Sequence, residues 1–154
     1  MSEPVGRRRF EVSATLPASP EDVIDLLVDL GRHRGLHPFL TSAVMVGSGT
    51  SAEGVWRDWR VEERPTLGPL RYRLRFPVRT LRTSATSMTA VVRAAPGCWL
   101  CSASQARPDR TGGSGSQVVE TTVVTAPWPV LGYMARTAEA AHARTFSALP
   151  DVLG

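Results

Sequence analysis

Apolar and polar residues alternate with a period of two over residues 10–16, whose sequence is FEVSATL. This alternation is typical of a strand with one buried face. Six later segments have a strand-like composition and are bounded by glycine- or proline-rich breaks. They predict strands at 41–48, 54–63, 69–76, 82–93, 98–107 and 117–125.

The alternation is clearest in residues 70–76, LRYRLRF. Leucine, tyrosine and phenylalanine share one face of this predicted strand, and three arginines share the other. The pattern predicts a sheet with one dry face and one solvated face.

A helical period first appears after Ser19, which is predicted to cap a helix over residues 20–30 because its side chain can accept a backbone hydrogen bond. Pro20 suits the first helical position. Apolar residues then follow the i, i+3, i+4, i+7 pattern, and Gly31 is predicted to end the helix in a left-handed conformation. Residues 32–39 predict a turn or a second short helix.

A long helix is predicted over residues 129–149, ending at Pro150. Its inward stripe is rich in small residues, whereas a helix packed tightly on a sheet is expected to present leucine and isoleucine. A slim helix facing large apolar side chains leaves room for a cavity, and close approach of helix to sheet is the alternative. The predicted cavity residues are Trp59, Tyr72, Leu74, Phe76, Met88, Met134, Thr137, Ala138 and Ala141.

This order of elements predicts an α+β fold in which a curved antiparallel sheet of six or seven strands wraps around the C-terminal helix. A chain of 154 residues is expected to form one domain. No apolar run reaches the length of a membrane span, and the N-terminal segment MSEPVGRRRF lacks the apolar block of a signal peptide. A cytoplasmic protein without integral membrane association is therefore expected.

The net charge of +4 comes from arginine, because the chain has no lysine. The arginines are spread along the chain and balanced by 14 acidic residues, whereas a nucleic-acid-binding protein is expected to gather its basic residues on one face beside aromatic groups. Nucleic acid is therefore not an expected partner. The charge is interpreted as an ordinary solvated surface.

Cys98 and Cys101 form a CxxC motif, a spacing that also occurs in redox and zinc sites. The motif enters a predicted strand, where residues three apart face opposite sides and are too far apart for a disulfide. Two buried structural thiols are expected. The glycine-rich segment 108–116 lacks the GK[ST] sequence of a phosphate-binding loop and predicts a hairpin loop.

The segments 11–23 and 27–30, EVSATLPASPEDV and LVDL, resemble the start of the START-like helix-grip superfamily (SRPBCC), which includes polyketide cyclases/dehydrases and lipid-transport proteins. In element order the resemblance extends from about residue 8 to 150. It implies a deep cavity between the sheet and the terminal helix that takes an apolar or aromatic ligand. The tryptophan common after the first helix of the family is absent, with Leu36 and His37 in its place.

Three polar residues are candidates for chemistry in such a cavity. The strand phase that buries Trp59 also points Arg57 inward, where it would bind the polar end of a ligand with Tyr72 as a possible hydrogen-bond partner. The alternative is that a bulge or the strand end carries Arg57 to solvent. His142 would act as an acid or base if it faces the cavity, and a solvent-facing histidine is the alternative.

Metal and cofactor sites have weaker support in the sequence. His33 and His37 have the i, i+4 spacing of two metal ligands, but a third ligand is not evident, so no metal site is expected. No cofactor fingerprint, paired-carboxylate signature or Ser-His-Asp order is present, and no cofactor is expected.

The function that these features predict is binding or transport of a hydrophobic small molecule such as a lipid, a fatty acid or a polyketide-like aromatic. The alternative is a polyketide aromatase/cyclase acting in the same cavity. A third class, a protein-interaction module, would show an exposed apolar patch in place of a deep pocket. The sequence leaves open whether the chain forms a homodimer.

Overall fold

Seven long strands form one antiparallel sheet in the computed structural model, which describes residues 4–110 and 113–153. Their order across the sheet is β1-β9-β8-β7-β6-β3-β2. Among these seven strands every neighbouring pair except β1–β9 is consecutive along the chain. The bounds are β1 Val5–Leu16, β2 Leu40–Ser51, β3 Gly54–Glu63, β6 Leu74–Ser84, β7 Ser87–Ala95, β8 Cys98–Pro108 and β9 Ser116–Pro127.

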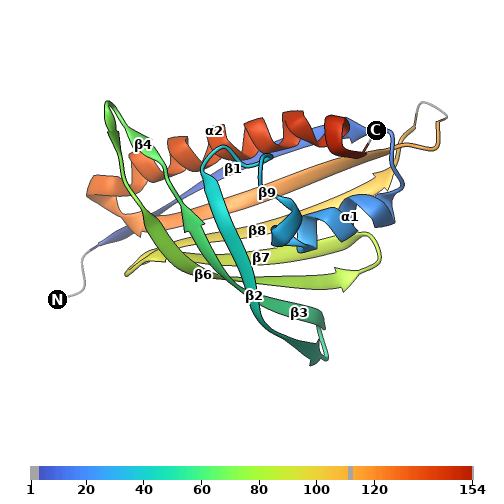
Figure 1. Ribbon diagram of the computed structural model, residues 1–154, viewed down its shortest axis with the longest axis horizontal. Coiled ribbons are helices and arrows are strands. Elements are labelled where there is room, and N and C mark those ends of the chain that lie inside the picture. The colour runs from blue at the N-terminus through green and yellow to red at the C-terminus, as the bar shows by residue number, and fades with distance from the viewer. Residues whose placement is uncertain (1–3, 111–112, 154) are drawn as a thin grey trace.

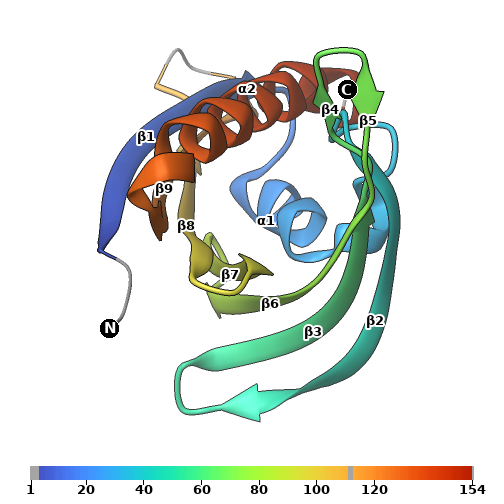
Figure 2. The same cartoon turned by 90° about the vertical axis from the view of Figure 1, so that its left-hand side faces the viewer.

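The sheet curls around two helices, α1 (Pro20–Val28) and the long C-terminal α2 (Trp128–Leu153) (Figures 1 and 2). Helix α2 packs against β1 and β9, and α1 packs mainly against β8 and β9 toward the other end of the sheet. This is the α+β helix-grip arrangement that the sequence predicted. No helix in the described ranges is long and apolar enough to cross a membrane.

Helix α1 begins as its sequence predicts, because the Ser19 hydroxyl accepts a hydrogen bond from the backbone N–H of Asp22 (3.2 Å) and Pro20 occupies the first turn. Its end differs from the prediction. The helix stops at Val28, and the Asp29 carboxylate accepts from the N–H of Gly31 to start a short 3₁₀ helix, η1 (Leu30–Arg32). Gly31 therefore belongs to η1, and the predicted left-handed stop there is wrong.

The strands predicted at 69–76 and 82–93 are wrong in their bounds. The chain turns at Gly68, whose φ of +59° favours glycine, inside a small hairpin formed by β4 (Thr66–Leu67) and β5 (Leu70–Arg71). The register of this hairpin continues that of β3 and β6, so the four strands form one long ribbon.

The predicted break after residue 76 is absent, because β6 runs through Pro77. Pairing of β6 with β7 starts at the next residue, Val78, so the missing N–H of the proline lies at the margin of that pairing. The next turn lies between Ser84 and Ser87.

Helix α2 also continues past its predicted end, since Pro150 lies in its final turn. A proline there removes few helical hydrogen bonds. The helix approaches β1 closely at Gly6, where an added Cβ would lie 2.7 Å from Leu131 Cδ2.

The two cysteines face opposite sides of β8, as predicted, but the expectation that both are buried is wrong. Cys98 is buried and Cys101 is exposed on the outer face. The predicted loop at 108–116 connects the paired strands β8 and β9, and its residues 111–112 lie outside the described residues.

Candidate functional site

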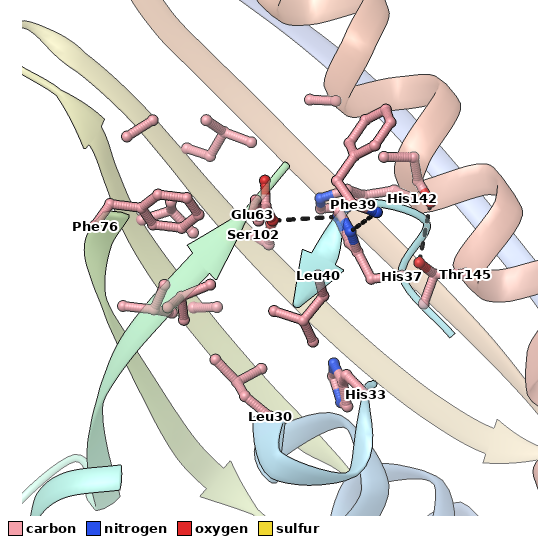
Figure 3. Close-up of a pocket in the computed structure, with 18 of the residues that line it drawn as sticks. Leu30, His33, His37, Phe39, Leu40, Glu63, Phe76, Ser102, His142 and Thr145 are labelled. Atoms are coloured by element: carbon pink, nitrogen blue, oxygen red, sulfur yellow. Dashed lines mark hydrogen bonds and ion pairs between the residues drawn. The ribbon is translucent and has the colours of Figure 1, made fainter. Parts of the chain in front are cut away.

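A cavity of about 220 Å³ lies between the inner face of the sheet, η1 and α2. Its walls are mainly aliphatic and aromatic side chains, and Figure 3 shows several of them pointing inward from β3, β6 and η1. The small side chains of α2 face this space. They therefore support the prediction of a cavity over the alternative, in which the helix packs closely on the sheet. The predicted residues that line it are Tyr72, Leu74, Phe76, Met88, Met134, Thr137, Ala138 and Ala141.

Two predicted site residues are not among those that line this cavity. Trp59 is buried, and its indole Nε1–H donates to the Thr80 hydroxyl (3.1 Å), which does line the cavity. Arg57 has the inward strand phase that was predicted, but it borders a separate shallow depression beside Asp29. The reason is its position along β3, because Arg57 lies before Trp59 and the cavity begins beyond that ring, at Val61.

Tyr72 forms a hydroxyl pair with Tyr133, and the two oxygens are 2.7 Å apart. Tyr72 follows β5 and Tyr133 lies in the second turn of α2, so this hydrogen bond joins the β4–β5 hairpin to the helix. Burial and the hydrogen bond with Tyr133 raise the pKa of Tyr72. One hydroxyl of the pair donates to the other, which leaves a second O–H proton free to bind a ligand atom.

His142 is hydrogen-bonded to Glu120 through Nδ1, which joins α2 to β9. Glu120 also accepts hydrogen bonds from the hydroxyls of Thr122 (3.2 Å) and Ser104 (3.3 Å). Burial opposes both charges, but the hydrogen bond and mutual attraction prevail, so the pKa of His142 is raised and that of Glu120 is lowered. Each partner therefore favours the charged form of the other, and the hydrogen bond through Nδ1 leaves Nε2 on the opposite side of the His142 ring.

His37 and Glu63 form a second polar pair on the cavity wall, shown by a dashed line in Figure 3. His37 Nδ1 accepts the backbone N–H of Phe39 (3.2 Å), so the proton of the neutral ring is on Nε2, 3.6 Å from Glu63 Oε1. Burial lowers the pKa of His37 to about 3 and raises that of Glu63 to about 7. Both groups are therefore neutral between about pH 3 and pH 7.

The His37 and His142 rings are 6.2 Å apart, so the two polar pairs are neighbours. His33 lines the cavity, with Nε2 2.8 Å from the Leu26 carbonyl oxygen, and burial lowers its pKa. Among the described residues there is no group of three or more His, Cys, Asp or Glu side chains arranged to hold a metal ion.

The sequence reasoning missed Glu120, Glu63 and Tyr133. A signal for Glu120 was present, because it has the same strand phase as Val118 and Val124, which predicts burial of a carboxylate among valines. Glu63 likewise shares its phase with Val61. No comparable signal marks Tyr133, whose contact with Tyr72 depends on where the β4–β5 hairpin folds.

Comparison with known proteins identifies the fold. No family model matches the chain, and no curated protein sequence matches it. Among solved structures, the Zhui aromatase/cyclase from Streptomyces sp. R1128 is similar over 96% of this chain and 94% of that chain, with a TM-score of 0.75 and 13% identity.

Two further solved structures have the same arrangement. Ara h 8.0201 is similar over 96% of this chain and 98% of its own, with a TM-score of 0.68 and 13% identity. The di-domain ARO/CYC BexL from the BE-7585A biosynthetic pathway matches over 96% of this chain and half of its own, with a TM-score of 0.71 and 13% identity. At these identities the likeness establishes the fold alone.

Proposed function

We propose that this chain, which has the helix-grip fold of START-like proteins, binds an amphipathic small molecule in the cavity between its sheet and α2. The ligand has an apolar or aromatic body and a hydrogen-bonding end. The observation that carries this proposal is a cavity with mostly apolar walls that also contains two neighbouring polar pairs. A few converging polar groups in an apolar pocket are typical of a small-molecule site.

The apolar part of the ligand would lie against Phe76, Met88 and Met134, which come from β6, β7 and α2. The polar end would bind the hydroxyl pair of Tyr72 and Tyr133 or the ring of His142. A protonated Glu63 offers a further donor below pH 7, so the site favours a carbonyl or hydroxyl group over an amine.

Native mass spectrometry of the purified protein, followed by denaturing extraction, tests this proposal. A stoichiometric amphipathic molecule that leaves on denaturation is the expected result. An empty protein that also fails to bind a fluorescent fatty-acid probe would count against binding of this class.

A second function, catalysis by proton transfer, is favoured by the Glu120–His142 pair. A carboxylate that holds one nitrogen of a histidine orients the ring and leaves its other nitrogen available as an acid or base. Two of the similar structures are named as aromatase/cyclases, a class that needs such proton transfers. The proposed reaction is closure of a ring in a polyketide-like chain held in the cavity.

Replacement of His142 by Gln separates the two functions. Retained binding with loss of product formation from a poly-β-carbonyl substrate would support catalysis. Equal product formation by the variant and the wild type would exclude His142 as the acid or base, and no product from either protein would leave binding as the function.

A further inference from the structure

One end of the molecule combines exposed apolar side chains with basic ones, and Figure 2 faces this end. It is formed by the start of β1, the start of α2 and the β4–β5 hairpin, and we call it the hairpin end. Val5 pairs with Pro127, and the N–H of Trp128 donates to the Pro4 carbonyl (3.3 Å), so β1 and α2 begin side by side. The Tyr72–Tyr133 hydrogen bond joins the hairpin to the same part of α2.

Large apolar side chains protrude from all three segments of the hairpin end. Leu70 at the hairpin is 66% exposed, Trp128 at the start of α2 is 58% exposed, and Val5 on β1 is 53% exposed. They stand on separate segments and do not form one groove. A protein partner would need a separate matching pocket for each, whereas the interfacial region of a lipid bilayer accepts them wherever they protrude.

Exposed arginines occupy the same end. Arg7 and Arg8 lie on β1 beside Val5, and Arg71 follows Leu70 directly in the hairpin. The first turn of α1, which begins where β1 ends, instead carries Glu21 and Asp22. The hairpin end therefore carries basic side chains beside its exposed apolar ones, whereas the first turn of α1 is acidic.

We propose that the hairpin end docks on an anionic lipid surface. Each basic side chain near such a surface contributes attraction, and tryptophan and leucine bury apolar area at the headgroup level. Pro65, Tyr72 and Tyr133 belong to this end and also line the cavity, so docking would place the cavity beside the bilayer. The association is peripheral. This surface is additional to the proposed ligand site and does not depend on the identity of the ligand.

Vesicle sedimentation tests the proposal with a matched pair of double variants. The first, Arg8→Gln with Arg71→Gln, removes two charges at the hairpin end. The second, Arg107→Gln with Arg110→Gln, removes two exposed charges near the opposite end of β8. The vesicles are phosphatidylcholine alone or mixed with phosphatidylglycerol, at low ionic strength.

The wild type is expected to sediment with the mixed vesicles and to stay in solution with phosphatidylcholine alone. The hairpin-end variant should lose about 25-fold in partition coefficient, about fivefold for each arginine, while the second variant keeps its binding. Trp128→Ser should also weaken binding, with Val55→Ser, an exposed apolar position at the start of β3, as its control. Thermal unfolding checks that each variant is folded.

Equal losses in the two arginine variants would overturn the proposal, because they would indicate attraction to the whole molecule. The proposal would also be overturned if the wild type does not sediment with anionic vesicles but is retained on a polyglutamate resin. That result would indicate an acidic protein partner. Binding of a fluorescent probe in the absence of vesicles reports on the cavity separately, so failure here is distinguishable from failure of the proposed function.

Discussion

Glu120 of β9 and His142 of α2 are hydrogen-bonded on the cavity wall, and each shifts the pKa of the other toward the charged form against the effect of burial. The contact joins the sheet to the helix that closes the fold. It also places an oriented imidazole on the wall of a mostly apolar space. Both proposed functions draw on this one relationship, since the ring can hold the polar end of a ligand or exchange a proton with it.

Replacing Glu120 by Gln is expected to lower the pKa of His142, because the amide keeps the size of the side chain and removes the charge that holds the proton on the ring. NMR titration of the histidine ring protons measures this, and the chain has only three histidines to assign. The wild-type value should lie above 6.5 and the variant value below it. An unchanged pKa would show that the pair is not ionic.

Replacing Glu63 by Gln is expected to change how stability depends on pH. Burial raises the pKa of Glu63 from 4.5 to about 7, so the folded state holds a proton that the unfolded chain releases. Its stabilising contribution is complete below pH 4.5 and is lost as the pH rises through 7, by about 3 kcal/mol.

Glutamine mimics the protonated carboxyl group but does not titrate, so the variant does not lose this stability as the pH rises. The difference in unfolding free energy between the wild type and the variant should therefore shift against the wild type between pH 4.5 and 7. Denaturant unfolding of both proteins at several pH values measures it. Parallel pH profiles would mean that Glu63 titrates normally.

Thr80→Val should destabilise the fold by about 1–3 kcal/mol, because it leaves two buried groups without partners. The Thr80 hydroxyl accepts from Trp59 and donates to the Val28 carbonyl at the end of α1 (3.2 Å). Thr121→Val, at a half-buried position on the outer face of β9, is the control and should change stability little. Urea unfolding compares the two, and similar losses would contradict the structural role of the hydroxyl.

Removing the hydroxyl of either Tyr72 or Tyr133 is expected to loosen the β4–β5 hairpin from α2. Hydrogen–deuterium exchange of residues 66–72 should quicken in each Phe variant, and stability should fall by about 1 kcal/mol. The double variant should lose little more than either single variant, because all three lack the same hydrogen bond. Additive losses would show that the two hydroxyls act separately.

The fold was predictable from the sequence wherever local chemistry and strand period agreed. The Ser19 cap, the strand over residues 54–63 and the small-residue stripe of α2 all follow from such local patterns. Predictions failed at Pro77 and Pro150, because a proline breaks an element only where its N–H is needed. The ends of the elements are set by partners distant in sequence.

The candidate site was predictable only in part. The apolar walls of the cavity follow from strand phase. The burial of Glu120 could have been predicted in the same way. On β3 the sequence predicted Arg57 as the polar group of the cavity, but Glu63 has that place. Strand phase specifies which face a residue is on, but it does not specify where along the strand the cavity lies. Likewise, the partner of His142 could not be named from its own helix, because the carboxylate comes from a strand 22 residues earlier.

The most direct test of the central claim is a titration with the apolar probe N-phenyl-1-naphthylamine on two variants of neighbouring α2 positions. Ala138→Phe fills the cavity, whereas Ala140→Phe adds the same ring to the exposed face of the helix. Saturable fluorescence in the wild type and Ala140→Phe, with none in a folded Ala138→Phe, is the predicted result. Equal binding by both variants, or no binding by any of the three proteins, would contradict a small-molecule site in this cavity.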